Sequence, residues 1–190
     1  VNGDQFSQVD KRFQSAMNLS HLWVNRIGGL EVENTAGIQF QNDVIDNGLL
    51  STKQRQTLST TRKDHINQNS VGLYYQNSIQ WLEKFRSVAG VRSDYYWFDV
   101  SSHQAVNSGK RYDSITNPKI SLIFGPWAQT EFYFNYGGGF HSNDARGTTT
   151  TVDPKSGDPV NRVNPLVRST GYEVGVRTAI VPGLQVSLAA

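Results

Sequence analysis

The sequence predicts an all-β fold, an antiparallel up-and-down meander of about eight long strands that forms part of a transmembrane β-barrel wall. Three observations support this prediction. The chain contains runs that alternate apolar and polar residues, several runs approach about fifteen residues, and the connections between runs alternate between short and long. In a meander, every second connection lies at the same end of the sheet. Short turns at one end and long polar loops at the other are typical of outer-membrane barrels.

The alternation of residues places the individual strands. We expect them at about 12–27, 30–45, 66–81, 85–100, 112–124, 129–141, 166–180 and 184–190. In the sixth run, Phe132 and Phe134 share one face, while Glu131 and Tyr133 share the other. Such runs are about twice as long as the strands of globular proteins and suit a wall that crosses a bilayer at a tilt. The apolar face would contact lipid, and the polar face would line a wet lumen.

The connections are of two kinds. Short turns are expected at 28–29, 82–84, 125–128 and 181–183, and long loops at 46–65, 101–111 and 142–165. The long loops are rich in small polar and charged residues, and 148–151 is a run of four threonines. Because such sequence cannot bury a core, we expect these loops, including 148–151, to be mobile.

Composition excludes several other classes of protein. Mean hydropathy is −0.49, and no stretch approaches the roughly 18 apolar residues of a transmembrane helix. The absence of cysteine excludes disulfide scaffolds and thiolate metal sites, and a net charge of +2 argues against a nucleic-acid partner. The first residues have no signal-peptide pattern, so we expect an export signal to have been removed or to lie upstream. Trp23, Trp81, Trp97 and Trp127 are interpreted as interfacial aromatic residues.

Three motifs in the second half of the chain carry a family resemblance. They read NPKISLIFGPW from Asn117, EFYFNYGGGFHSNDARG from Glu131, and PLVRSTGYEVGVR from Pro165. Together they resemble the barrel of TonB-dependent outer-membrane receptors, and a weaker likeness covers most of the remaining chain. The resemblance implies a Gram-negative outer membrane and uptake of a scarce ligand, such as a ferric siderophore, cobalamin or a glycan, through extracellular loops and a plugged lumen.

The resemblance also implies what the chain does not contain. Members of the family have a barrel of about 22 strands, a plug domain and a TonB box. We therefore expect residues 1–190 to be a single internal segment of the barrel, without plug, box or C-terminal strands. The implied partners are outer-membrane lipid and a small-molecule ligand, with TonB contacted only through the missing plug and box. No cofactor and no nucleic acid is expected.

Two sets of residues are candidates for ligand binding. The loop set is His141, Asn143, Asp144 and Arg146, and the lumenal set is Glu131, Tyr133, Glu173 and Arg177. Each set has a structural alternative: Asp144 and Arg146 would pair to order the loop, and the lumenal residues would form cross-strand polar pairs. No metal site is expected, because Asp153 and Asp158 are better explained as turn formers than as calcium ligands.

Catalysis is not expected. There is no Gly-x-Ser-x-Gly elbow, and Glu31 and Glu33 would point into a wet lumen that does not raise the pKa of a carboxyl. Two alternative functions remain. One is a self-contained eight-stranded outer-membrane barrel that serves as a small pore or an adhesion or stability protein, and the other is a soluble carbohydrate-binding β-sandwich.

Overall fold

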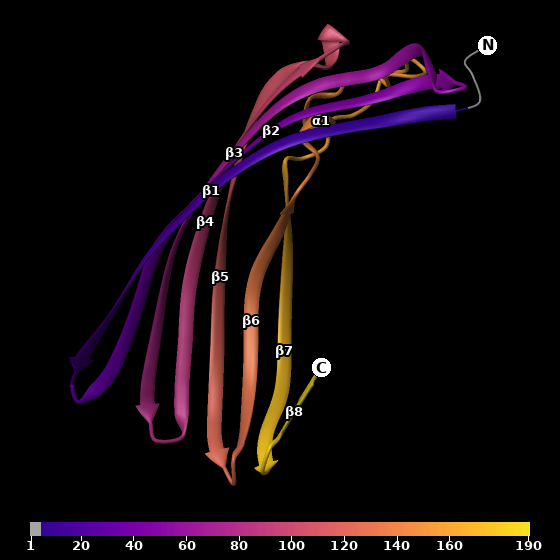
Figure 1. Ribbon diagram of the computed structural model, residues 1–190. Coiled ribbons are helices and arrows are strands. Elements are labelled where there is room, and N and C mark those ends of the chain that lie inside the picture. The colour runs from indigo at the N-terminus through magenta and orange to yellow at the C-terminus, as the bar shows by residue number, and fades with distance from the viewer. Residues whose placement is uncertain (1–4) are drawn as a thin grey trace.

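The computed structural model describes residues 5–190 as one antiparallel sheet of eight strands in sequential order (Figure 1). The strands are β1 (Gln5–Ile27), β2 (Leu30–Lys53), β3 (Gln56–Leu82), β4 (Phe85–Ser102), β5 (Gly109–Trp127), β6 (Thr130–Ser142), β7 (Leu166–Val181) and β8 (Leu184–Ala189). The predicted meander is therefore confirmed. Two short helices, η1 (Ala105–Asn107) and α1 (Ala145–Thr149), lie in the upper connections. None of the helices within residues 5–190 is long and apolar enough to cross a membrane.

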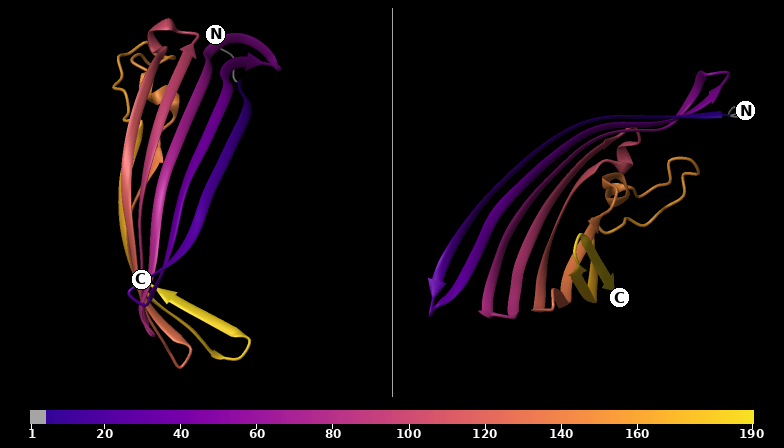
Figure 2. Two further views of the ribbon diagram at one scale, coloured as in Figure 1. Left: turned by 90° about the vertical axis from the view of Figure 1, so that its left-hand side faces the viewer. Right: turned by 60° about the horizontal axis from the view of Figure 1, so that its bottom comes forward.

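The sheet curls into part of a barrel wall. Figure 2 shows β1 and β8 at the two ends of the curl, and no ladder joins these two strands within the described residues. A closed eight-stranded barrel would require that ladder. A sandwich would require two packed sheets, whereas all eight strands here belong to one.

Residue alternation gives the sheet one apolar and one polar face. Cross-strand partners share a face, so the register Phe40–Val71–Tyr95 lies on one side and Gln39–Gly72–Asp94 on the other. The first side carries many exposed large apolar residues, among them Leu73 at 46% and Phe132 at 51% exposure. In a barrel of this class lipid covers the apolar face, and the polar face lines the lumen.

Aromatic residues gather at two levels of the apolar face. Near the short turns, the rings of Phe85 and Phe124 stack at 4.9 Å, and Trp127 lies 6.3 Å from Phe132. At the other level, Trp97 pairs with Tyr112 across β4 and β5. The two levels are twelve residues apart on β4, which is ~40 Å along a strand and ~28 Å along the membrane normal at a tilt of about 45°. This spacing matches the apolar band of an outer-membrane barrel, which is ~25 Å tall.

The lower turns agree with the sequence prediction except at one place. β5 continues through Gly125 to Trp127, and the turn lies at Ala128 and Gln129, whose φ angles are 46° and 59°. The β1–β2, β3–β4, β5–β6 and β7–β8 turns lie at the bottom of Figure 1, and the β2–β3, β4–β5 and β6–β7 connections lie at the top.

The expected long loop at 46–65 is wrong. β2 runs to Lys53 and β3 starts at Gln56, so only a tight turn at Gln54 and Arg55 separates them. These two residues have φ angles of 50° and 65°, as the right-handed twist of a two-residue hairpin requires. The sequence obscured this extension because residues 46–65 are mostly polar on both faces of the hairpin and show no apolar alternation. The loop expected at 101–111 is likewise shorter, since β4 ends at Ser102 and β5 begins at Gly109.

The long connection between β6 and β7 is confirmed, but its expected lack of packing is wrong. α1 lies against the polar face of the sheet, where Ala145 joins an apolar cluster with Ile45, Ile66, Phe98 and Val100. Thr148 and Thr149 of the four-threonine run are 0% and 2% exposed. Thr148 is stabilised there because its hydroxyl donates to the carbonyl of Ala145 at 2.7 Å. The threonine run is thus part of a packed helix end.

Candidate ligand-binding surface

The structure separates the sequence-predicted residues into two sets at opposite ends of β6. Glu131 and Tyr133 lie beside the lower turn, whereas Asn143, Asp144 and Arg146 lie in the upper connection. The ten residues from Glu131 to His141 correspond to ~33 Å of strand. The two sets therefore cannot contact one small molecule together.

The lower set forms cross-strand polar pairs. Glu131 and Arg177 are direct partners on β6 and β7, and the guanidinium Nε and Nη2 donate to Glu131 Oε2 at 2.6 and 2.5 Å. In the neighbouring pair, Asn135 Nδ2 donates to Glu173 Oε1 at 3.1 Å. Tyr133 lies flat on the wall, because a Cβ at Gly175 would be 2.3 Å from its ring. This geometry favours the alternative of a polar ladder, and a ligand role for these residues stays a prediction.

Asp144 and Arg146 form a local pair that starts α1. Asp144 caps the helix by accepting from the backbone N–H of Arg146 at 2.9 Å, and it also accepts from the guanidinium Nε at 2.9 and 3.1 Å. Partial burial disfavours the charged carboxyl, but the hydrogen bonds from Arg146 outweigh it and hold the pKa of Asp144 below its ordinary value. Arg146 also donates to Asn47 Oδ1 on β2 at 2.5 Å. The pair thus orders the loop and joins it to the wall.

The remaining two loop candidates lie at the base of the connection. Asn143 closes it, since its backbone N–H donates to the carbonyl of Pro165 and its Nδ2 to the carbonyl of Asn164, both at 2.8 Å. His141 is exposed near the end of β6, opposite Val167 on β7. Of the loop set, His141 is the residue whose side chain is most available to a ligand in solution.

Sequence reasoning missed a buried residue that holds the loop through several hydrogen bonds. Asn107, in η1, is 1% exposed, and its Nδ2 donates to the carbonyl of Val152 at 2.8 Å. Its Oδ1 accepts from the backbone N–H groups of Thr151 and Val152 at 2.9 and 3.0 Å. Arg62 on β3 adds a further contact, with Nη2 donating to Thr150 Oγ1 at 3.2 Å. A single asparagine in a polar connection has no sequence pattern that would reveal this role.

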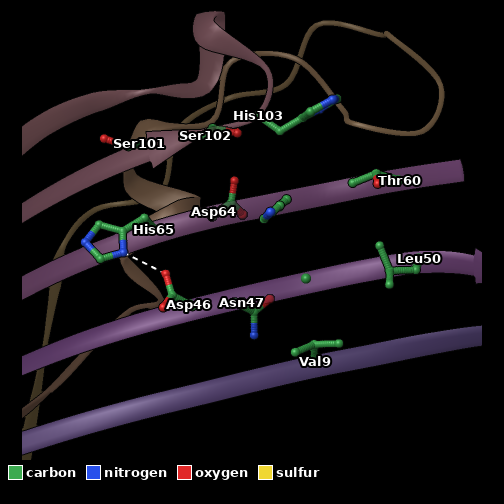
Figure 3. Close-up of a pocket in the computed structure, with 12 residues that line it drawn as sticks. Val9, Asp46, Asn47, Leu50, Thr60, Asp64, His65, Ser101, Ser102 and His103 are labelled. Carbon is green, nitrogen blue, oxygen red and sulfur yellow. Dashed lines mark hydrogen bonds and ion pairs between the residues drawn. The ribbon is translucent and has the colours of Figure 1, made fainter. Parts of the chain in front are cut away.

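A groove of about 790 Å³ lies on the upper parts of β1–β4, on the face of the sheet opposite to the one that α1 contacts (Figure 3). Its lining includes Asp46, His65 and Leu50, which alternate along their strands with residues that face α1. Figure 3 shows the His65 ring pointing to Asp46, and the two atoms Nδ1 and Oδ1 are 2.7 Å apart. This hydrogen bond lowers the pKa of Asp46. The groove could not be predicted, because it depends on the hairpin that the sequence pattern presented as a loop.

The turn at Asp153 agrees with its interpretation as a turn former. Asp153 Oδ1 accepts from the backbone N–H groups of Lys155 and Ser156 at 2.9 and 2.8 Å, and these bonds lower its pKa. In the part of the chain that the structure describes, no group of three or more His, Cys, Asp or Glu residues is arranged to hold a metal ion.

Comparison with known proteins identifies the architecture. The family model described as TonB dependent receptor-like, beta-barrel matches residues 1–190. Similar solved structures include the unliganded ferric citrate transporter FecA (TM-score 0.72, 12% identity, 91% of this chain and 26% of that chain) and BauA, the ferric preacinetobactin receptor of Acinetobacter baumannii (0.71, 12%, 92% and 28%). Another is the closed form of Fiu, the ferric-catecholate import receptor of K12 E. coli (0.71, 13%, 95% and 30%). The chain spans only about a quarter to a third of these chains. No curated protein sequence matches it.

Proposed function

Because this chain belongs to the TonB-dependent receptor β-barrel family, we propose that it forms part of the wall of a Gram-negative outer-membrane receptor that takes up a ferric siderophore. The observation that supports this most directly is the family match over residues 1–190, together with a sheet that is apolar on one face and polar on the other. The similar structures are named as ferric citrate, ferric preacinetobactin and ferric-catecholate proteins, which favours an iron chelate over cobalamin or a glycan.

In this proposal, the parts of the segment have different tasks. The apolar face contacts membrane lipid, and the upper connections lie where a ligand would enter. His141 is exposed near the upper end of β6, and Asn143, Asp144 and Arg146 fix the shape of the adjoining loop. Glu131, Tyr133, Glu173 and Arg177 line the lower lumen, where a ligand or a plug would pass. Coupling to TonB would be supplied by a plug domain and a TonB box.

The experiment is uptake of radioactive iron by cells that depend on this protein. Cells lacking the gene are complemented with the natural protein and given ferric citrate, a ferric catecholate or a ferric hydroxamate under iron limitation, with labelled cobalamin and a labelled maltooligosaccharide in parallel. We expect complementation to restore uptake of one ferric chelate. Restored uptake of cobalamin or the oligosaccharide instead would contradict the siderophore assignment, and no restored uptake of any of them would contradict a role in transport.

A further inference from the structure

β6 separates from β5 halfway up the wall. The ladder between the two strands includes Phe124–Phe132 and ends at Lys119–Gly137. Above that point, β5 continues to Gly109 but pairs only with β4, whereas β6 and β7 stay paired up to Ser142–Leu166. Residues 138–170, called the flap here, are therefore a hairpin with no ladder to β5 within the described residues.

The flap crosses the lumenal face of β5 instead of continuing in the plane of the sheet. A Cβ at Gly138 would lie 2.8 Å from Asn117 Oδ1, so the flap backbone rests directly on a residue that is 3% exposed. Phe140 reaches beyond β5 and packs edge-on against Tyr96 of β4, with ring centroids 5.9 Å apart. The glycines at 137–139 permit this close approach, because a larger residue at 138 would collide with Asn117.

Side-chain contacts take the place of the missing ladder. Arg168 Nη1 donates to the carbonyl of Thr116 at 2.8 Å and to Asn117 Oδ1 at 3.0 Å. Near the top of the flap, the backbone N–H of Leu166 donates to Asp113 Oδ2 at 3.3 Å. These few hydrogen bonds hold the flap to β5 where a continued ladder would have supplied a regular series.

The far end of the flap is held by the upper connections. Asn107 binds the backbone of Thr151 and Val152, and Gln104 Nε2 donates to the carbonyl of Pro154 at 3.2 Å. Ala145 is 3% exposed in the apolar cluster, and Arg146 donates to Asn47. The flap thus has a glycine segment at one end and a concentrated attachment at the other, and the contacts of Phe140, Leu166 and Arg168 lie between them.

We propose that the flap, residues 138–170, is a hinged element that rotates as one unit about the paired glycines Gly137 and Gly171, with Asn107 as the latch that holds it against the wall. The docked flap covers the lumenal face of the upper half of β5, and release of the latch would uncover that face and widen the lumen. This movement concerns the wall itself and does not depend on which ligand the protein carries.

The first test is limited trypsin digestion of isolated outer membranes from cells that express the protein. Lys155 and Arg162 are exposed cleavage sites in the flap, and Lys53 and Arg55 at the β2–β3 turn provide an internal control. N107A leaves two backbone N–H groups and a carbonyl without their partner, so we expect cleavage in the flap to be about tenfold faster and control cleavage to be unchanged. N161A, which changes an exposed asparagine of the same loop, should behave like the natural protein.

The second test separates rotation of the whole flap from fraying of its loop. In this cysteine-free sequence, N117C with G138C places two Cβ atoms about 3.2 Å apart, a few tenths of an ångström below the roughly 3.5–4.5 Å of a disulfide. We expect the disulfide to form readily and N107A to slow its formation severalfold, while S121C with N135C, below the hinge, is unaffected. Faster flap cleavage with an unchanged disulfide rate would mean that only the loop frays and would overturn the hinge. Unchanged cleavage would overturn the latch, and failure of the disulfide to form at all would contradict the docked position.

Discussion

At the scale of residues, polar side chains in this segment join separate stretches of backbone by hydrogen bonds. Asn107 binds the backbone of Thr151 and Val152 in the β6–β7 connection, and Arg168 binds the carbonyl of Thr116 on β5, where no backbone ladder is present. Asp144 begins a five-residue helix that could not form from its sequence alone. The sequence identified Asp144 and Arg146 correctly as a local pair, because closely spaced opposite charges in a loop commonly interact. It could not identify Asn107, whose partners in the β6–β7 connection, Thr151 and Val152, are more than forty residues away.

The Asp144–Arg146 pair makes docking of the loop sensitive to acid. The pKa of Asp144 lies below its ordinary value of 3.8 in the folded protein, so its contribution to stability is complete above pH 3.8 and is lost as the pH falls through the lowered value. V160C introduces the single cysteine of this sequence, to which a fluorophore can be attached. The fluorescence anisotropy of this label should be constant from neutral pH to about pH 4 and lower in stronger acid. D144N should show low anisotropy already at neutral pH. An acid transition that is the same in D144N would contradict this assignment.

The Glu131–Arg177 pair distinguishes a structural ladder from a ligand contact. The two side chains are 25% and 43% exposed, so we expect E131Q or R177Q to lower stability by about 1 kcal/mol or less and to leave uptake unchanged. The measurement is the midpoint of heat-modifiable gel migration, together with uptake of the transported ligand. Normal migration with lost uptake would show that this pair contacts the ligand.

At the scale of elements, the sequence predicted the strands between the two aromatic levels well and the elements above them poorly. In the proposed outer-membrane setting, one face of these strands meets lipid and the other meets water, so alternation is expected in the sequence. Beyond the upper level, mostly polar side chains occupy both faces of β2 and β3, so the pattern that marks a strand disappears although the ladder continues to Lys53 and Gln56. α1 was not predicted because its position depends on an apolar cluster contributed by distant strands.

That apolar cluster should carry most of the docking of α1. Phe98 is 1% exposed, and F98A removes the largest side chain of the cluster, which typically costs about 3–5 kcal/mol in a packed core. We expect faster trypsin cleavage at Lys155 and Arg162 in F98A. L58A, at a position that is 49% exposed, is the matched control and should leave the rate of trypsin cleavage unchanged. Equal cleavage rates in the two variants would show that the cluster does not hold the loop.

At the scale of the whole molecule, one sheet has an apolar face and a polar face. The curl, the two aromatic levels and the family match support the proposal that lipid covers the first face and that the second lines the lumen. The same division reconciles a mean hydropathy of −0.49 with the proposed outer-membrane setting, since only every second residue of a barrel strand needs to be apolar. Under the proposed function, the apolar face would determine insertion, and the polar face and upper connections would be available for selectivity.

The measurement that tests this account most directly is a matched pair of valine-to-arginine substitutions on β4. Val91 lies on the apolar face midway between the aromatic levels, and Val88 lies on the polar face three residues away. Folding into lipid vesicles is followed by heat-modifiable migration and protease protection. We expect V91R to lose about 2–4 kcal/mol of stability and to insert poorly, and V88R to insert normally. Normal insertion of V91R together with failure of V88R would mean that the faces are assigned the wrong way round and would contradict the account.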